Sequence, residues 1–409
     1  MSQLKKNLRE AGRKKAPQKS PAKSGAKAKA PSKGPKKAAK RKAATDTLAD
    51  IIVSDVCMKL KGQGKKRDVG SISLLNDSRV LSEVKEWIPT MFPELDIILG
   101  GGWAVGRASE VFGKEGSGKS ALAHMAIKGC QLQGGTVLYI DFEAALDPPK
   151  MAQLGIDPKR LIYCTPADVE EAWDIVWTTL DALAKNPPKH PFLIVWDSVA
   201  ASVPRAELEE KSSGDSHVAL LAKSMSKGCR KMYRAIPTVR AHMMWINQER
   251  TKFGGSSFMA QTETPGGKSI KYATSQRVRC AVIKRRKENG EDKAPTGYTI
   301  MASTEKCRLY PPHRKAMWVL NFIHGPSPLL TVWHLCMEHH LIKSTGGGYY
   351  KARWSDEKFQ KKEWLKFMAD DEFHDAAMEA YSALLVDLHK TDLVAAGDTD
   401  DEESGTETD

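Results

Sequence analysis

The stretch "VFGKEGSGKSALAHM" (residues 111–125) decides the fold of this chain, because it places G-x-x-x-x-G-K-[ST] between a strand-like run and a helical pattern. Its glycines let the backbone curl so that N–H groups face phosphate oxygens, and the helix N-terminus adds partial positive charge. Lys119 is expected to reach the outer phosphates of ATP or GTP, and the Ser120 hydroxyl to ligate Mg²⁺. The predicted nucleotide-binding residues are Gly113, Lys114, Glu115, Gly116, Ser117, Gly118, Lys119 and Ser120.

The surrounding pattern alternates strand and helix, which is typical of an α/β domain with a mainly parallel sheet. Residues 168–185 carry apolar side chains at helical spacing and are predicted to form one buried helix stripe: Val169, Ala172, Trp173, Val176, Leu180 and Leu183. The predicted strands are "RASEVF" (107–112), "TVLYID" (136–141), "LIYCTP" (161–166), "FLIVWD" (192–197) and "HMMWINQ" (242–248).

The pattern changes after about residue 275. The runs "QRVRCAVIK", "YTIMASTEK" and "KAMWVLNF" have no long helix between them, which indicates an antiparallel extension of the sheet. A separate small module is expected after "HGPSP" (324–328), and residues 45–62 read as an isolated amphipathic helix that docks on something else.

Charge is concentrated at the two ends of the chain. Residues 1–45 hold sixteen Lys and Arg against one acid, whereas the whole chain has a net charge of +13. With almost no large apolar residue, this segment is expected to be a disordered basic arm that binds nucleic acid through counterion release. The alternatives are a solubility or localisation tail and an organellar transit peptide. Residues 398–409 contain seven acids and no base, and are expected to be a disordered acidic tail.

Cysteine use and hydropathy exclude several classes of protein. The seven cysteines include no Cys-x-x-Cys pair, so neither a disulfide framework nor a zinc site is indicated. The sequence contains no apolar run long enough for a membrane helix and begins without a secretory h-region. A cytoplasmic, DNA-associated location without membrane contact is therefore expected.

Two carboxylates follow predicted strands. Asp197 ends the apolar run "FLIVWD", where a carboxylate can hold the metal ion through water; the alternative is an ordinary strand-ending aspartate. Glu143 lies two residues past "TVLYID", at the edge of the sheet where ligands bind in such folds. It is the candidate for polarising an attacking water, and the alternative is that it caps the next helix.

Seven strings make the chain resemble the bacterial branch of the RecA family of strand-exchange recombinases. They are "PELDIILGGGWAVGR", "GKEGSGKS", "YIDFEAALDP", "VWDSVAASVPRAELE", "GDSH", "INQ" and "TPGGKSIKY", and they cover roughly residues 87–325. The resemblance implies an α/β RecA-like P-loop NTPase core with a mainly parallel sheet, an antiparallel extension, an N-terminal helix and a small α+β C-terminal domain. The basic arm (1–45) is not typical of the bacterial proteins and is expected from composition alone. The expected division after it is an N-terminal helix and oligomerisation segment (46–86), the ATPase core (87–325), the small domain (326–390) and an acidic tail (391–409).

The resemblance also implies residue roles. Glu143 becomes the water-activating carboxylate, and Gln248 senses the terminal phosphate and signals to a DNA loop. The two DNA loops correspond to about 209–216 and 249–267, with Phe253 as an apolar wedge between bases. The implied DNA-binding residues are Lys223, Ser226, Arg230, Arg250, Lys252, Phe253, Gly266 and Gly267. Taken without the resemblance, the basic residues of the helix that carries Lys223 read as a solvated face.

In this family ATP sits between protomers, and the neighbour supplies cations. The matching residues here are Lys306 and Arg308, with Lys271 as a further candidate, and Asp147 of "LDP" joins the nucleotide contacts. One departure is Lys150, which stands where the bacterial proteins place an aromatic side chain over adenine.

The implied function is a DNA-dependent ATPase with ATP and Mg²⁺ as cofactors. It forms a helical homo-oligomeric filament on single-stranded DNA, pairs it with homologous double-stranded DNA and exchanges strands in recombination and repair. A single-strand-binding protein and loading mediators are implied as further partners. Two alternatives stay open, a RecA-like hexameric DNA helicase and a non-exchanging recombination mediator. The complete set Lys119, Glu143, Asp197 and Gln248 argues against the mediator.

Overall fold

The computed structural model describes residues 83–209, 217–251, 262–287 and 294–397. The basic arm, the predicted helix at 45–62, the tail from 398 and the loop segments 210–216 and 252–261 lie outside the described residues. Lys252 and Phe253 are among them, so their DNA contacts stay predictions.

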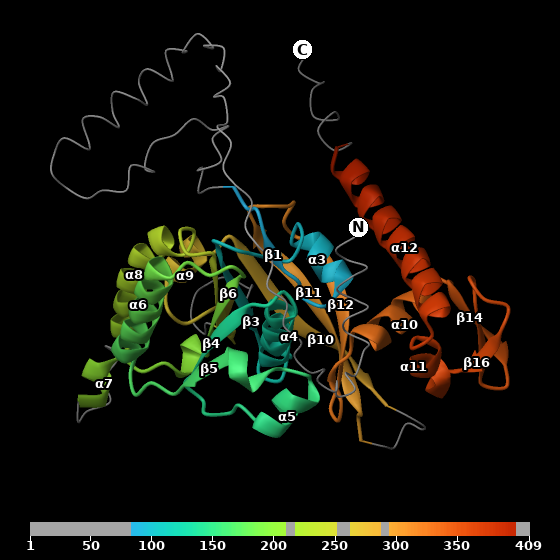
Figure 1. The fold of residues 1–409 in the computed structure, drawn as a ribbon, viewed down its shortest axis with the longest axis horizontal. Coiled ribbons are helices and arrows are strands. Elements are labelled where there is room, and N and C mark those ends of the chain that lie inside the picture. The colour runs from blue at the N-terminus through green and yellow to red at the C-terminus, as the bar shows by residue number, and fades with distance from the viewer. Residues whose placement is uncertain (1–82, 210–216, 252–261, 288–293, 398–409) are drawn as a thin grey trace, which may run out of the picture. The chain divides into compact units, whose positions relative to one another are not determined.

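A nine-stranded sheet forms the centre of the fold, in the order β13-β12-β11-β10-β3-β7-β6-β4-β5 (Figure 1). Every pair from β10 to β5 is parallel, and every pair from β10 to β13 is antiparallel. This topology confirms the predicted α/β core with an antiparallel extension. Its strands are β3 (Ala108–Gly113), β4 (Thr136–Asp141), β5 (Leu161–Cys164), β6 (Phe192–Asp197), β7 (Ala241–Gln248), β10 (Gln276–Arg286), β11 (Gly297–Cys307), β12 (Lys315–Asn321) and β13 (Gly325–Pro326).

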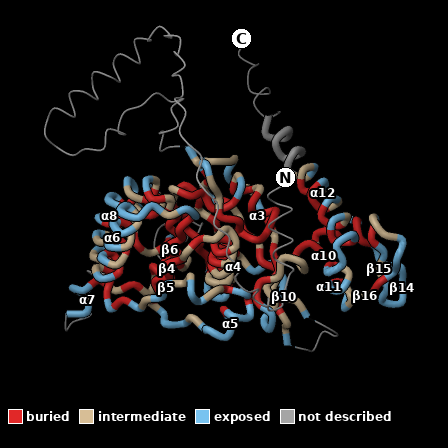
Figure 2. The backbone as a smooth tube through the Cα atoms, in the orientation of Figure 1, coloured by how far each residue is buried: buried red, intermediate tan, exposed pale blue. Residues whose placement is uncertain are grey.

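Both faces of the inner parallel strands are buried, which explains their continuous apolar runs (Figure 2). In β6, Leu193 and Val195 belong to one hydrophobic core, and Ile194 and Trp196 to the other. Helix α4 packs in the first core, and helices α6 and α8 pack in the second. The helices of this region are α3 (Pro93–Ile98), α4 (Lys119–Leu132), α5 (Pro148–Gln153), α6 (Val169–Lys185), α7 (Arg205–Glu209), α8 (His217–Ala235) and α9 (Lys268–Ala273), with 3₁₀ turns η2 (Pro158–Arg160) and η3 (Val199–Ala201).

Helix α6 shows how local sequence sets an element. The Asp168 carboxylate accepts a hydrogen bond from the Glu171 N–H at 2.7 Å, which satisfies one of the free donors at the start of the helix. The predicted stripe is buried from Val169 to Leu180, and Leu183 packs half-buried at its edge. Short strand pairs complete the core: β1 (Trp87–Ile88) with β2 (Trp103–Ala104), and β8 (Arg250–Thr251) with β9 (Thr262–Glu263).

The small α+β module has a hydrophobic core of its own. Aromatic rings dominate it, with Trp333, Phe359 and Trp364 in mutual contact. Helix α12 continues past residue 390, which the expected division took as the end of the small domain, and ends just before the acidic run at 398. The elements are α10 (Pro328–Glu338), β14 (Ile342–Gly346), β15 (Tyr349–Ala352), β16 (Lys358–Gln360), η4 (Lys361–Glu363), α11 (Trp364–Phe367) and α12 (Asp371–Gly397).

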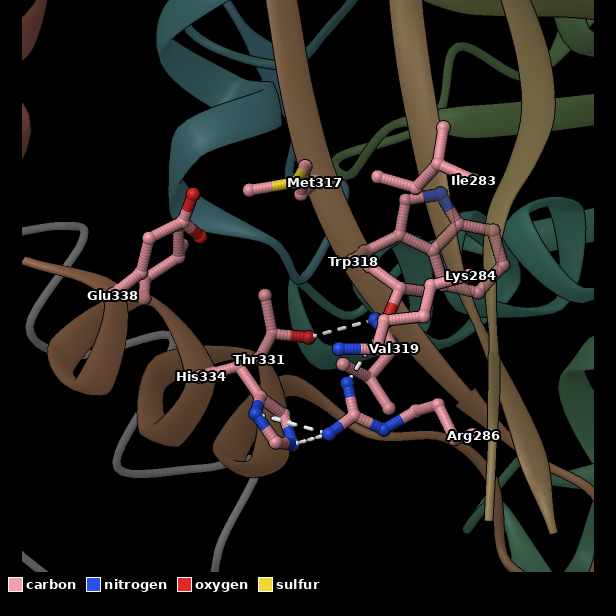
Figure 3. A pocket seen from close by; sticks show the side chains of 11 residues that line it. Ile283, Lys284, Arg286, Met317, Trp318, Val319, Thr331, His334 and Glu338 are labelled. Carbon is pink, nitrogen blue, oxygen red and sulfur yellow. Dashed lines mark hydrogen bonds between the residues drawn. The ribbon is translucent and has the colours of Figure 1, made fainter. Parts of the chain in front are cut away.

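A cavity of about 390 Å³ separates helix α10 from strands β10, β11 and β12 (Figure 3). Arg286 and His334 point toward each other across it, and the guanidinium contacts the imidazole ring. Burial and then the Arg286 charge lower the pKa of His334 to about 3, so the ring is neutral and accepts the hydrogen bond. None of the predicted site residues lines this cavity.

Within the described ranges, no helix is long and apolar enough to cross a membrane.

Candidate nucleotide and DNA site

The predicted phosphate loop joins β3 to α4. Gly113, Gly116 and Gly118 have φ values of 156°, 69° and 82°, a region that favours glycine. A Cβ atom at Gly118 would lie 2.8 Å from the Trp318 ring, and one at Gly113 would collide with the Cys280 carbonyl oxygen. Glycine is therefore required at both positions by the packing of the loop on β10 and β12 as well as by its backbone.

Two polar groups in the loop suit a phosphate. Lys119 Nζ donates to the Lys114 carbonyl oxygen at 2.8 Å, and burial lowers the pKa of Lys119 while acidic neighbours such as Asp197 oppose that change. The Ser117 hydroxyl is buried and has no hydrogen-bond partner among the described residues. A buried hydroxyl without a partner and a desolvated ammonium group at a helix N-terminus both fit a bound phosphate.

Ser120 and Asp197 lie together at the carboxyl edge of the sheet. The Asp197 carboxylate accepts a hydrogen bond from Tyr139 Oη at 2.7 Å and another from the Ser120 side chain. Burial raises the pKa of Asp197, a cost that a divalent cation beside the carboxylate would offset. The described residues contain no cluster of three or more His, Cys, Asp or Glu able to enclose a metal. One carboxylate and one hydroxyl, completed by water and phosphate oxygens, fit Mg²⁺.

Glu143 is exposed two residues beyond β4. Its Oε1 accepts a hydrogen bond from Ser198 Oγ at 2.6 Å, and its charge acts on Lys119. The two residues meet because β4 and β6 end in register, with Asp141 opposite Asp197. The next helix, α5, begins after Asp147, so Glu143 does not cap it.

Gln248 ends β7 directly opposite Gly113 of β3. The next residue, Glu249, donates its backbone N–H to the Gly113 carbonyl oxygen at 3.0 Å. Buried Asn247 donates from Nδ2 to the Pro265 carbonyl oxygen at 2.9 Å, while its Oδ1 accepts from the Gln248 N–H. The two ends of the second predicted DNA loop are therefore bonded to the strand end beside the phosphate loop.

The predicted neighbour-directed cations lie elsewhere on the sheet. Gly113 pairs with Cys280 of β10, whereas Lys306 pairs with Arg277 near the amino end of that strand and Arg308 lies beyond it. Lys306 Nζ donates to the Lys271 carbonyl oxygen at 2.6 Å. Burial, then the Arg308 charge, lower the pKa of Lys306 to about 8. The chain therefore does not bring these cations into its own phosphate loop.

Asp147 and Lys150 belong to the start of helix α5, and both side chains are exposed. Asp147 occupies the N-cap position without making a side-chain capping hydrogen bond. The Lys150 charge acts on His124 of α4, whose pKa is lowered to about 4, mainly by burial. Lys150 is therefore close enough to α4 for its charge to act on His124, and it stands where the bacterial proteins place an aromatic side chain.

Helix α8 carries a row of exposed basic side chains. Lys223 and Arg230 are exposed as the spacing predicts, and Ser226 lies half-buried between them, with its carbonyl oxygen accepting from Arg230 Nε at 3.3 Å. Arg250 is exposed in β8. The same helix also presents basic residues that no sequence motif had indicated: Lys227, Lys231 and Arg234.

The two glycines that close the second loop have internal contacts. A Cβ atom at Gly266 would lie 2.6 Å from Ile270 Cδ1, and one at Gly267 would lie 2.9 Å from Ala222 Cβ. Their φ values of 85° and 74°, together with close packing on α9 and α8, account for glycine at both positions, whatever their part in binding DNA.

Sequence reasoning missed three polar residues that support this edge of the sheet. Tyr139 and Ser198 bond the two carboxylates Asp197 and Glu143, and Asn247 holds the root of the second loop. All three lie within strings that carry the family resemblance, but no residue spacing assigned them a role. The signal that identifies them is the register between strands that are far apart in the sequence.

The fold and the loop define this chain as a P-loop NTPase of the RecA-like class. A model of the RecA N-terminal domain matches residues 55–327. The chain is 35% identical to Protein RecA of Streptomyces rimosus over 285 residues, which is 69% of this chain and 73% of that protein. It is 35% identical to Protein RecA of Thermotoga petrophila over 282 residues, covering 69% and 76% of the two chains. The match to Protein RecA of Francisella tularensis subsp. novicida has 34% identity over 300 residues, covering 73% and 80%. The chain belongs to the RecA family.

Proposed function

We propose that this protein is a DNA-dependent ATPase that assembles as a helical filament on single-stranded DNA, pairs it with homologous duplex and exchanges strands. One observation carries the proposal. Strands β3, β7, β6 and β4 end side by side, which gathers the phosphate loop, Gln248, Asp197 and Glu143. The bond between the Glu249 N–H and the Gly113 carbonyl oxygen joins this cluster to the loop expected to bind DNA.

Hydrolysis in this proposal uses residues at the shared edge. The loop N–H groups and Lys119 hold the phosphates, and Ser120 with Asp197 would hold Mg²⁺, which supplies positive charge to the phosphate oxygens. The Glu143 carboxylate accepts a proton from a water whose oxygen forms a bond to the γ-phosphorus. The bond from that phosphorus to the β–γ bridging oxygen breaks, and ADP and phosphate leave. The Ser198 hydroxyl orients Glu143 for this proton transfer.

In this proposal Gln248 reports the state of the γ-phosphate. It lies beside Gly113, and the DNA loop begins immediately after it. An amide at this position bonds a γ-phosphate when one is present and is released when it leaves. The exposed lysine and arginine side chains of α8, together with Arg250, contact DNA phosphates. Such contacts do not distinguish one base from another, so the sequence is read by base pairing between the DNA strands.

Assembly completes the site in this proposal. Lys306, Arg308 and Lys271 lie toward the amino ends of the strands, away from the chain's own phosphate loop. In a filament they would serve the nucleotide of an adjacent protomer, which makes hydrolysis depend on polymerisation. Because the chain belongs to the RecA family, we also propose a single-strand-binding protein and loading mediators as partners.

The test combines microscopy with a joint-molecule assay. The full chain with ATP and single-stranded DNA should form helical filaments and should convert circular single strands and linear duplex into joint molecules. Closed hexamers that unwind forked DNA would instead indicate a helicase, and binding without joint molecules would indicate a mediator.

The variant Glu143→Gln isolates the chemical step. It should bind ATP and DNA normally but hydrolyse ATP about 100-fold more slowly, because loss of general base catalysis typically costs 10²–10⁴-fold. Filaments formed with ATP should consequently persist. Glu357→Gln is the matched control, since Glu357 is an exposed carboxylate of the small module. Wild-type turnover in Glu143→Gln would remove Glu143 as the base.

A further inference from the structure

Asp141, the last residue of β4, is the centre of a hydrogen-bond cluster that the proposed mechanism does not use. The residue is buried, with 3% of its surface exposed. Oδ1 accepts from the Glu143 N–H at 3.0 Å, and Oδ2 accepts from the Ala145 and Leu146 N–H groups at 3.0 and 3.1 Å. One side chain therefore holds three backbone groups of the turn that carries Glu143. Hydrogen bonds from N–H groups to a carboxylate are about twice as strong as neutral ones.

The turn needs such an anchor because its backbone is strained. Ala144 has a φ of 49°, in the left-handed region that non-glycine residues seldom occupy. A strained residue of this kind persists only where its surroundings hold it, at a cost of order 1–3 kcal/mol. Ala144 is exposed and lies between the residues whose N–H groups Asp141 accepts. The anchor therefore acts on the backbone on both sides of the strained residue.

Tyr163 makes a fourth bond to the same carboxylate. Its hydroxyl donates to Asp141 Oδ2 at 3.1 Å from β5, the strand at the edge of the sheet. Desolvation and then the Asp141 charge raise the pKa of Tyr163, so the hydroxyl stays protonated and remains a donor. The Tyr163 ring stacks on Tyr139, whose hydroxyl bonds Asp197. The two tyrosines thus connect the carboxylate under the turn with the carboxylate of the predicted metal site.

We propose that Asp141 is a positioning residue for ATP hydrolysis, which fixes the turn at 142–146 so that Glu143 faces the phosphate loop while Ser198 orients its carboxylate. This inference rests on the proposed function, because it assumes that Glu143 is the base. Asp141 contacts none of the reacting atoms and acts only through Glu143. Its side chain lies below the turn, with both oxygens engaged by protein donors.

The informative variant is Asp141→Asn. The asparagine amide has one acceptor oxygen, whereas the carboxylate has two. Its NH₂ group would therefore point at backbone N–H donors that a carboxylate oxygen accepts in the wild type. The kcat of the DNA-stimulated ATPase should fall by about 100-fold, the effect expected when a reacting group is displaced by about 1 Å. The KM for ATP should stay within about threefold, since the phosphate loop is unchanged. Asp157→Asn is the matched control, because Asp157 also accepts a backbone N–H, from Lys159 at 2.9 Å, but in a different turn.

Two measurements separate positioning from a general loss of structure. Hydrogen exchange of nucleotide-free protein should be faster in peptides spanning 142–147 of Asp141→Asn, and unchanged there in Asp157→Asn. In the Glu143→Gln background, Asp141→Asn should cause little further loss of kcat, because the two residues act as one unit.

Each outcome decides a different claim. Unchanged exchange in 142–147, or a kcat within threefold of wild type, would overturn the positioning role. The role would also be overturned if Asp141→Asn lowered kcat by the same factor in the wild-type and Glu143→Gln backgrounds. Wild-type turnover in Glu143→Gln alone would refute the proposed base, while faster exchange would still establish that Asp141 holds the turn.

Discussion

Glu94 makes the stability of this protein depend on pH in an unusual direction. It lies in α3, is 8% exposed, and its Oε2 accepts from the Met317 N–H at 2.8 Å. The charged or titratable groups that act with it are Glu338 of α10 and Tyr381 of α12. Burial raises the pKa of Glu94 from 4.5 to about 7, the Met317 hydrogen bond opposes this, and Glu338 adds to it.

The sign follows from proton binding. A carboxyl whose pKa is higher in the folded state binds its proton more tightly there, so its contribution to the free energy of unfolding is full below pH 4.5 and is lost as the pH rises through about 7. A change from 4.5 to about 7 corresponds to ~3 kcal/mol. Glu94→Gln keeps an acceptor for Met317 and removes the charge. The variant should match wild type near pH 4.5 and be more stable by ~3 kcal/mol at pH 8.

The assay is urea unfolding of both proteins at several pH values between 4.5 and 8. Buried Asp96, whose pKa burial also raises to about 7, is present in both proteins and cancels in the difference. Glu357→Gln serves as the control, because this exposed carboxylate of the small module is not among the groups that shift the pKa of Glu94, so its free energy of unfolding relative to wild type should change much less with pH. A difference between Glu94→Gln and wild type that stays constant with pH would refute the reasoning.

Two further predictions concern a buried ion pair and the basic arm. Arg277→Met should lower the free energy of unfolding by about 3–5 kcal/mol, because Arg277 Nε bonds fully buried Glu110 at 2.6 Å; adding Glu110→Gln should recover part of the loss, and urea unfolding equal to wild type in the single variant would contradict this. Removing residues 1–44 should flatten the plot of log binding constant against log salt by roughly 0.7 for each single-strand phosphate that the arm neutralises, measured by fluorescence anisotropy on an oligonucleotide; an unchanged slope would mean that the arm does not bind DNA.

The sequence was sufficient to predict the core because its signals are local. The run "FLIVWD" matches β6 at both ends, since a strand buried on two faces must be apolar throughout. The signal for the phosphate loop is equally local, because the positive φ angles of the loop require glycine at fixed positions. The partners of Glu143 could not be predicted in the same way. Ser198 reaches it only because β4 and β6 end in register.

The buried polar and charged side chains were the least predictable feature of the fold. Glu110 and Asn247 lie inside strands that read as apolar, and they bond each other at 2.9 Å across 137 residues of sequence. Glu94 looks like a helix-surface residue in the sequence, yet it is buried and bonded to the Met317 N–H of β12. No periodicity indicates such pairs, because the partner comes from a distant element and the pairing depends on tertiary packing.

Strand β12 touches the phosphate loop with one face and the small module with the other. The Trp318 indole packs under Gly118, whereas neighbouring Val319 bonds Thr331 of α10 and Met317 packs with the module's core. A fragment that stops at residue 327 would thus retain every residue predicted to bind phosphate, yet it would expose to solvent the side of β12 that packs on the small module. Nucleotide affinities measured on such a fragment would report a phosphate loop whose support by β12 is weakened, and would not describe the intact protein.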